Sequence, residues 1–271
     1  MKIYDCFSYW DEDLLLDLRL NILDKYVDYF VVVEGNKTWQ NNPKKLRFNI
    51  KNFSKFKNKI IYISVEDMPE GDNPYLRENF QRNCIMRGLS DASNEDMVII
   101  SDLDEIPNPD SIYKFKPNMR FAVFKQKHFY YKINSQSQKN PFWYGSKICV
   151  KKYLKSPQWL RELKFKKRPF WRIDKYRLNN ILDGGGWHFC NLKTAEELLY
   201  KYKNLCETND PYIFKEKIDK KYLELEAIKT KIHLGEDIIG RDEIYKKIKL
   251  DDSFPRYVLD NIEKYKNWIV N

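Results

Sequence analysis

At residues 97–105 the sequence reads Met97-Val98-Ile99-Ile100-Ser101-Asp102-Leu103-Asp104-Glu105. The four apolar residues predict a buried strand, and such runs are typical of parallel sheets that are covered on both faces. Three acidic residues follow where this strand ends. Because open α/β sheets bind their ligands at the carboxyl ends of strands, the stretch predicts both a fold class and the position of a site.

The N-terminal half alternates between strand and helix patterns. We expect strands at 2–9, 29–34 and 59–65, besides the one at 97–100, and helices at 13–23 and 74–90. The apolar face of the second helix would contain Leu76, Phe80, Cys84 or Ile85, and Leu89. The order β-α-β-β-α-β predicts an α/β fold with an open, mostly parallel sheet and helices on both faces.

The C-terminal half is less regular. Strands are expected at 120–133 and 144–150, and Gly184-Gly185-Gly186 punctuates the backbone before Trp187 and His188. Helical patterns follow at 194–206, 214–232 and 255–263. No internal repeat and no linker rich in Ser, Pro or Gly interrupts the chain, so we expect one domain over 1–271 with a helical C-terminal section.

Composition limits the protein class. No run of about 18 apolar residues occurs, which predicts no transmembrane helix. The N-terminus, 1–6, is typical of an opening strand and not of a signal peptide, so the cytoplasm is the expected location. The five cysteines contain no C-x-x-C pair, which argues against a zinc ribbon and predicts buried free thiols. They are Cys6, Cys84, Cys149, Cys190 and Cys206.

The net charge of +10 is concentrated in one segment. Residues 151–177 carry eleven Lys and Arg against Glu162 and Asp174, with aromatic residues interleaved. Such a stretch attracts phosphate-bearing ligands, nucleic acid or an acidic membrane surface. The alternative is a solvated face of a lysine-rich protein.

The acidic motif predicts a metal site. If residues 102–104 stay extended, Asp102 and Asp104 project to the same side, and they repel each other unless a cation neutralises them. A divalent ion would do so and could also bridge a diphosphate. His188, one of three histidines, follows the glycines and is a candidate third ligand, although an isolated histidine is commonly structural.

A second group of polar residues precedes the motif. Arg77, Gln81 and Arg82 share one side of the predicted helix, where they could hold the base, ribose or phosphates of a nucleotide. The alternative is an exposed polar helix face. The sequence has no G-x-G-x-x-G, P-loop, H-E-x-x-H or G-x-S-x-G motif, which disfavours dehydrogenases and kinases.

Several segments together resemble glycosyltransferase family 17. They occur in the family's order through most of the chain, to about residue 255. The segments are Tyr4-Asp5-Cys6-Phe7, 12–20, 27–34, Gln81-Arg82-Asn83, 100–107 and 186–189. Ordered matches over this length are more specific than any single motif.

The resemblance implies a GT-A fold, with a nucleotide-sugar-binding half at 1–115 and an acceptor-side half at 116–271. It implies an inverting reaction with a nucleotide-sugar donor, UDP-GlcNAc in known members, and a glycan acceptor. Mn²⁺ or Mg²⁺ would be held by Asp102, Asp104 and His188, with Asp102 also near the ribose. Glu34 would lie near the nucleotide.

The catalytic base is expected to be a carboxylate, because the acceptor hydroxyl must lose its proton. The candidates are Glu207, ranked first, then Glu105 and Asp183. At Leu205-Cys206-Glu207 the chain departs from the family pattern, in which a histidine precedes the glutamate.

We interpret the absence of a membrane anchor as favouring a bacterial type of acceptor, such as a lipid-linked or surface oligosaccharide. Segment 151–177 would then hold an anionic acceptor or contact the inner membrane peripherally. Two other functions stay open: another metal-dependent phosphate enzyme, such as a nucleotidyltransferase or nuclease, and a nucleic-acid-binding protein. Nucleic acid is not the expected partner, because that function leaves the acidic motif without a purpose.

Overall fold

Four parallel strands form the centre of the fold in the computed structural model, which describes residues 1–164, 180–206 and 223–270. Their order across the sheet is β3-β2-β1-β4. The strands are β1 (Ile3–Ser8), β2 (Tyr29–Gly35), β3 (Ile60–Val65) and β4 (Met97–Asp102). The strands predicted in the N-terminal half are confirmed, and β4 extends to include the first aspartate of the acidic motif.

The same sheet continues through strands of the second half. β9 (Lys147–Val150) pairs antiparallel with β4, and β6 (Phe121–Tyr130) pairs antiparallel with β9. β10 (Ile181–Cys190) lies between β6 and the short β5 (Glu105–Pro107). The remaining short strands are β7 (Ser135–Ser137), β8 (Phe142–Trp143) and β11 (Tyr245–Lys247). The expected α/β, GT-A-like architecture is confirmed.

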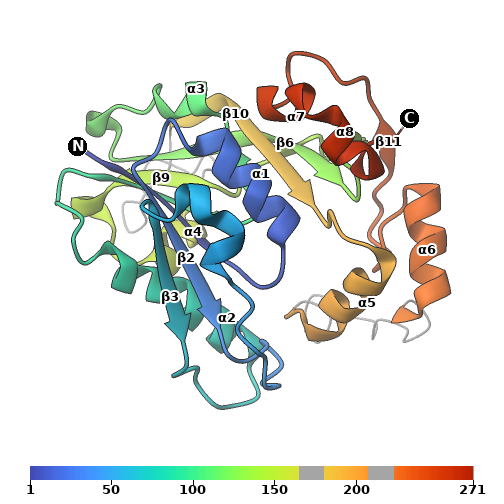
Figure 1. Cartoon of the computed structure of the whole chain (residues 1–271), viewed down its shortest axis with the longest axis horizontal. Helices are drawn as coiled ribbons and strands as arrows, with labels where there is room; N and C mark the ends of the chain where they lie inside the picture. The colour runs from blue at the N-terminus through green and yellow to red at the C-terminus, as the bar shows by residue number, and fades with distance from the viewer. Residues whose placement is uncertain (165–179, 207–222, 271) are drawn as a thin grey trace, which may run out of the picture.

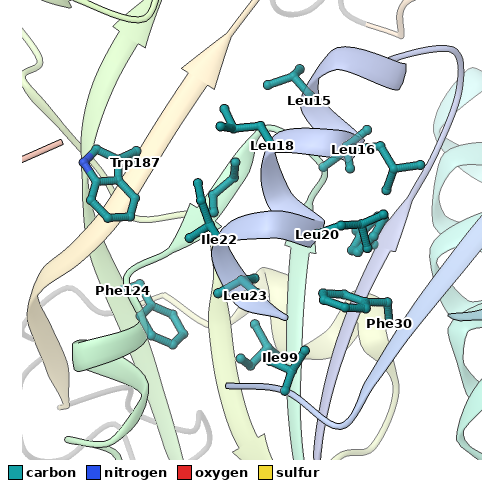
Figure 2. Packing of buried hydrophobic residues seen from close by; sticks show 14 of the residues in the cluster. Leu15, Leu16, Leu18, Leu20, Ile22, Leu23, Phe30, Ile99, Phe124 and Trp187 are labelled. Atoms are coloured by element: carbon teal, nitrogen blue, oxygen red, sulfur yellow. The ribbon is translucent and has the colours of Figure 1, made fainter. Parts of the chain in front are cut away.

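Helix α1 (Asp13–Leu23) covers one face of the sheet (Figure 1). Its leucines point toward Phe30, Ile99 and Trp187 (Figure 2), and nearly all of them are fully buried. Each buried leucine side chain stabilises the fold by roughly 1.5–3 kcal/mol relative to an exposed one. The short C-terminal helices α7 (Arg256–Asp260) and α8 (Ile262–Tyr265) pack into the same core, which confirms the helix expected at 255–263.

The opposite face is covered by α2 (Pro74–Asn83), a 3₁₀ helix (Cys84–Leu89) and α4 (Pro157–Glu162). The apolar face predicted for the helix at 74–90 is wrong in the first turns of α2, because Leu76 is 47% exposed. Arg77, Gln81 and Arg82 are buried instead. They can be buried because their donors meet backbone carbonyl and carboxylate oxygens. The 3₁₀ turn then brings Cys84, Ile85 and Leu89 into the core, as expected.

The remaining helices lie beyond the sheet's second half. α5 (Ala195–Asn204) begins with a capping box formed by Thr194 and Glu197 and packs beside α6 (Leu225–Leu234), as Figure 1 shows. The helix expected at 194–206 is confirmed, and that at 214–232 is seen from Leu225 because 207–222 lie outside the described residues. One short helix, α3 (Pro109–Ile112), follows β5. Short 3₁₀ helices occur at Ile50–Phe56, Pro117–Met119, Lys151–Tyr153 and Lys266–Trp268.

None of the helices in the described part of the chain has the length and apolar character needed to cross a bilayer.

The glycine run is part of strand β10 and not a boundary between elements. The pairing of β10 with β6 shifts register between Leu182 and Gly186, which marks a β-bulge. Gly186 has φ of +125°, and a Cβ there would lie 2.2 Å from the carbonyl oxygen of Ile106. The glycines therefore let β10 fit tightly against β5, and this fixes the position of His188.

Candidate active site

A cleft of about 1090 Å³ opens at the carboxyl ends of β1 and β4. Ser8 and Asp102, the last residues of these two strands, are neighbours in the sheet and both line the cleft. Asp104, Glu105 and His188 line it as well. The structure thus brings the acidic motif and the glycine-histidine motif together, although His188 lies 83 positions after Glu105 in the sequence. Both motifs lie where an open α/β sheet is expected to bind a ligand.

The acidic motif does not stay extended. The chain turns at Leu103 and Asp104 and then continues as β5. Arg19 holds this turn: its Nη1 atom donates to the carbonyl oxygens of Asp102, Leu103 and Glu105 at 3.1, 3.1 and 2.8 Å. The Arg19 side chain is itself paired with Asp5 at 2.6–2.7 Å, and both side chains are fully buried.

This buried pair was not predicted. Its signal in the sequence is a charged residue inside an apolar strand, Asp5, and another inside a leucine-rich helix, Arg19. Charges at such positions are almost never buried unless they are paired.

Two arginines neutralise Asp102. Arg82 Nη2 lies 3.2 Å from Asp102 Oδ1, and Arg161 Nη2 lies 2.6 Å from Oδ2. Burial opposes ionisation of Asp102, but Arg161 and Arg82 outweigh it and lower the pKa of this carboxyl below its usual value. We expected a metal ion to balance the charge of Asp102. The structure instead supplies two fixed guanidinium groups.

Glu105 anchors this arrangement. Its carboxylate is 1% exposed and accepts hydrogen bonds from both Nη atoms of Arg161 at 2.7 and 3.1 Å. The Trp143 indole donates to it at 2.6 Å, and the backbone N–H of Asp102 donates at 3.1 Å. Because both oxygens are occupied, Glu105 serves as a fixed negative charge that orients Arg161. A role as a mobile base would require these bonds to break.

The second aspartate belongs to a different cluster. Asp104, His188 and Cys190 each offer a ligand atom, and these atoms lie within 4.8 Å of one another. His188 and Cys190 point to the same side of β10 because strand side chains alternate, while Phe189 between them is buried in the core. The His188 Nε2 atom lies 3.5 Å from Asp104 Oδ1, and its buried Nδ1 has no hydrogen-bond partner among the described residues.

This cluster fits a divalent cation. Carboxylate oxygen, imidazole nitrogen and thiolate sulfur are all metal ligands, and an unpartnered buried ring nitrogen is unusual without one. Burial disfavours charge on Asp104, yet His188 beside it lowers the pKa of the carboxyl below its usual range. The carboxylate is therefore ionised and attracts a positive charge.

Aromatic rings pack against the cluster. The rings of His128 and His188 stack with centroids 4.9 Å apart, and Trp143 lies 5.0 Å from His188. Burial and the nearby His188 lower the pKa of His128 to about 4, so His128 is neutral at pH 7. Its Nδ1 lies 3.1 Å from the carbonyl oxygen of Asn140, which fixes the ring. The stack limits the rotation of His188.

Some predicted site residues are not brought to the cleft. Glu34 is fully buried and binds Lys44, the backbone N–H groups of Arg47 and Phe48, and the Tyr62 hydroxyl. Arg77 donates to the carbonyl oxygens of Trp39 and Gly71. Asp183 is exposed and pairs with Lys125 at 3.2 Å. None of the three lines the cleft.

Two other predicted residues do line the cleft, Gln81 and Arg82. Gln81 Nε2 donates to the Val33 carbonyl oxygen at 3.2 Å, so its amide ties α2 to β2. Glu207 lies outside the described residues, but Cys206 before it lines the cleft.

The basic segment is described only from 151 to 164, and 165–177 lie outside the described residues. Arg161 is turned inward and not to the surface, because its side chain is 13% exposed and pairs with Asp102 and Glu105. Lys151 donates to the Ala92 carbonyl oxygen, and Lys152 pairs with Glu95 at 2.9 Å. At least these three cations therefore have structural partners.

Known proteins resemble the whole chain. A model described as "Glycosyltransferase family 17" matches residues 1–269. Three mammalian proteins named "Beta-1,4-mannosyl-glycoprotein 4-beta-N-acetylglucosaminyltransferase" are also similar. Those from Rattus norvegicus and Mus musculus are 24% identical over 95% of this chain, and that from Homo sapiens is 24% identical over 93%. The chain spans about half, 52%, of the length of each. The family match over nearly every residue, together with the cleft that unites the two motifs, means that this chain belongs to glycosyltransferase family 17.

Proposed function

We propose that this chain is an inverting, metal-dependent transferase that moves GlcNAc from UDP-GlcNAc to a hydroxyl group of an acceptor glycan. The observation that carries the proposal is the position of Asp102, Asp104 and His188 together at the carboxyl edge of the sheet. The names of the mammalian relatives support the choice of GlcNAc. The cleft volume of about 1090 Å³ is sufficient for a nucleotide sugar and the end of an acceptor.

Donor binding would use both aspartates. A Mn²⁺ or Mg²⁺ ion held by Asp104 and His188 would neutralise the diphosphate as it leaves. Each oxygen of Asp102 accepts one bond from an arginine and keeps a lone pair, and the side chain is 41% exposed. Asp102 can therefore accept a hydrogen bond from a ribose hydroxyl without losing its arginines.

The base must lie on the acceptor side of the sugar. Of the three candidates, we propose Glu207, because Asp183 lies away from the cleft and Glu105 is fixed by Arg161. Cys206, the residue before Glu207, lines the cleft. We expect Glu207→Ala to keep its affinity for UDP-GlcNAc and to lose turnover roughly 10²–10⁴-fold. Asp183→Ala is the matched control and is expected to keep wild-type turnover.

Two classes of acceptor are to be compared. The relatives' names specify a β-1,4-mannosyl-glycoprotein, and the second class is a lipid-linked or surface oligosaccharide. Both can be offered to the purified protein with UDP-GlcNAc, and release of UDP measured. Release of UDP with neither acceptor above the rate without acceptor would refute a GlcNAc transferase of either specificity.

The donor and the metal can be tested without an acceptor. A thermal-shift screen of UDP-, GDP- and CMP-sugars with and without Mn²⁺ should show stabilisation by UDP-GlcNAc only when Mn²⁺ is present. Asp104→Asn is expected to abolish this shift while leaving the melting temperature of the free protein nearly unchanged. A shift that is equally large without metal would refute metal dependence. Peripheral membrane contact through 151–177, and with it a cytoplasmic location, is a separate proposal that liposome flotation tests.

A further inference from the structure

The metal ligands proposed above leave one position open. Asp104 and His188 supply two protein ligands, and metal sites that act in catalysis commonly have three. The first aspartate of the motif is a poor third ligand in this chain, because both of its oxygens already bind arginines at 2.6 and 3.2 Å. Recruiting Asp102 would bring the ion toward two guanidinium groups that repel it.

Cys190 occupies the place that the third ligand needs. Its Sγ atom lies within 4.8 Å of the ligand atoms of Asp104 and His188, a spacing that one ion can bridge after small side-chain movements. The alternation of β10 puts it on the same side as His188. Of the five cysteines it is the one that is not buried, so a cation in the cleft can reach it.

A second observation concerns His188, whose Nε2 lies 3.5 Å from Asp104 and whose ring also interacts with Cys190. His188 is only 6% exposed, and its Nδ1 atom has no hydrogen-bond partner in the described part of the chain. Most buried polar atoms have partners, and those without one commonly indicate a missing ion or water. The unpartnered nitrogen belongs to the ring that joins Asp104 and Cys190 in the cluster.

We propose that Cys190, and not Asp102, is the third protein ligand of the metal, so that the site has one carboxylate, one imidazole and one thiolate. This inference rests on the proposed metal dependence of the enzyme. On binding, the thiol proton of Cys190 passes to solvent and a sulfur–metal bond forms. A thiolate ligand favours borderline and soft ions, so the site binds Co²⁺, Zn²⁺ and Cd²⁺ in preference to Mg²⁺.

Cobalt spectroscopy tests this assignment without any substrate. The full chain, freed of metal with a chelator and kept without oxygen, is titrated with Co²⁺. A thiolate ligand produces an intense thiolate-to-cobalt charge-transfer band in the near ultraviolet, which carboxylate and imidazole ligands do not give. We expect this band in the wild type and its loss in Cys190→Ser. Cys206→Ser is the matched control, because Cys206 also lines the cleft but lies outside the cluster, and it is expected to keep the band.

A second variant distinguishes the loss of a metal ligand from a folding defect. Cys190→Asp replaces the soft ligand by a hard one, so it is expected to bind Co²⁺ and Mn²⁺ without the charge-transfer band. Loss of an outer-shell partner lowers metal affinity roughly 10–100-fold, and loss of a direct ligand should lower it at least as much. We therefore expect the ratio of Cd²⁺ affinity to Mn²⁺ affinity to be at least about tenfold lower in Cys190→Asp than in the wild type. Competition against Mn²⁺, followed by its magnetic resonance signal, gives this ratio.

Either of two results overturns the assignment. A wild-type protein that shows no thiolate band at saturating Co²⁺ has no cysteine ligand, and a band that survives in Cys190→Ser comes from another cysteine. Because these measurements need neither donor nor acceptor, they are independent of the transfer assay. A protein that fails to transfer GlcNAc but shows the Cys190-dependent band would refute the proposed function and leave the metal ligand established.

Discussion

Replacing Arg19 by methionine tests how the acidic motif is held. Arg19 is fully buried, donates two bonds to Asp5 and reaches three carbonyl oxygens of the motif's turn. Methionine fills a similar volume but has no donor. Arg19→Met therefore leaves the carboxylate of Asp5 buried without a partner and leaves the turn without its anchor.

The expected loss of stability is large. Removing one partner of a buried ion pair costs about 3–5 kcal/mol, because the remaining charge has no compensation. Unpaired buried carbonyl groups add about 1–3 kcal/mol. A domain is stable by only about 5–15 kcal/mol, so the free energy of unfolding of Arg19→Met should fall by a third or more. The double variant Asp5→Leu/Arg19→Met removes the stranded charge and should recover most of the first loss.

Stability and binding separate the two roles of Arg19. Urea unfolding gives the free energy of each variant, and calorimetry gives its affinity for UDP with Mn²⁺. The double variant should regain stability but still bind UDP and Mn²⁺ weakly, because nothing holds the carbonyl groups of Asp102, Leu103 and Glu105. If Arg19→Met loses less than about 1 kcal/mol, or if the double variant binds like the wild type, then Arg19 does not position the motif.

Three further variants test other parts of the structure. Burial and the nearby Arg161 lower the pKa of Lys147 from 10.5 to about 7, so between these pH values the unfolded chain binds more protons and stability rises with pH. Between pH 7 and pH 9 the free energy of unfolding of the wild type, measured by urea titration, should rise by about 2 kcal/mol more than that of Lys147→Met. Equal rises would contradict the lowered pKa of Lys147. We expect Gly186→Ala to lower the free energy of unfolding by at least about 2 kcal/mol more than Gly184→Ala, whose Cβ would meet no atom within 4 Å. Similar melting temperatures of the two variants would argue against the close contact of Gly186 with β5. Trp143, 40% exposed in the cleft, is expected to stack on the acceptor, so Trp143→Ala should raise the acceptor KM about three- to tenfold while Trp143→Phe recovers most of it. An acceptor KM that Trp143→Ala leaves unchanged would rule the contact out.

The sequence was sufficient for the sheet because its strands are long apolar runs. Residues such as Val31, Val32 and Ile99 have no stable place except a buried strand, and their alternation with helix patterns limits the topology. The sequence was not sufficient to predict strand β10. Its glycines signal a break in most chains, and only the neighbouring strands show that this run forms a bulge. Pairing between residues far apart in sequence is not visible in local patterns.

The prediction for the polar residues of the helix before the acidic motif was inaccurate for a different reason. Its polar residues Arg77 and Gln81 suggested an exposed or ligand-binding face, but they are buried because they donate to the backbone carbonyl groups of Trp39 and of Val33 in β2. A sequence pattern records that a residue is polar but not whether its partners are water, a ligand or the chain itself. The same ambiguity affects Glu34, whose partners are protein atoms and not a nucleotide.

The metal site on Asp102, Asp104 and His188 stays a prediction, but the structure shows that the two aspartates have different neighbours. The expectation rested on two aspartates that share one cation, but the turn at Leu103 separates their partners. Asp102 takes the fixed charges of Arg82 and Arg161, and Asp104 takes His188. Cys190 was expected to be a buried free thiol, and only the structure, which makes 181–190 a strand, puts it on the same side as His188.

The division between the two aspartates has a physical consequence. Two neighbouring carboxylates repel each other, and the structure gives each one a different set of compensating groups. Fixed guanidinium groups keep Asp102 ionised whether or not a metal is present, so its side of the cleft is formed in advance for the ribose that we propose it binds. Asp104 lies beside His188 and Cys190, and under the proposed metal dependence its charge would be available to a cation that accompanies the diphosphate. The chain thus holds the Asp102 side with fixed charges and leaves the Asp104 side exchangeable, which would suit the proposed release of a charged nucleotide after each transfer.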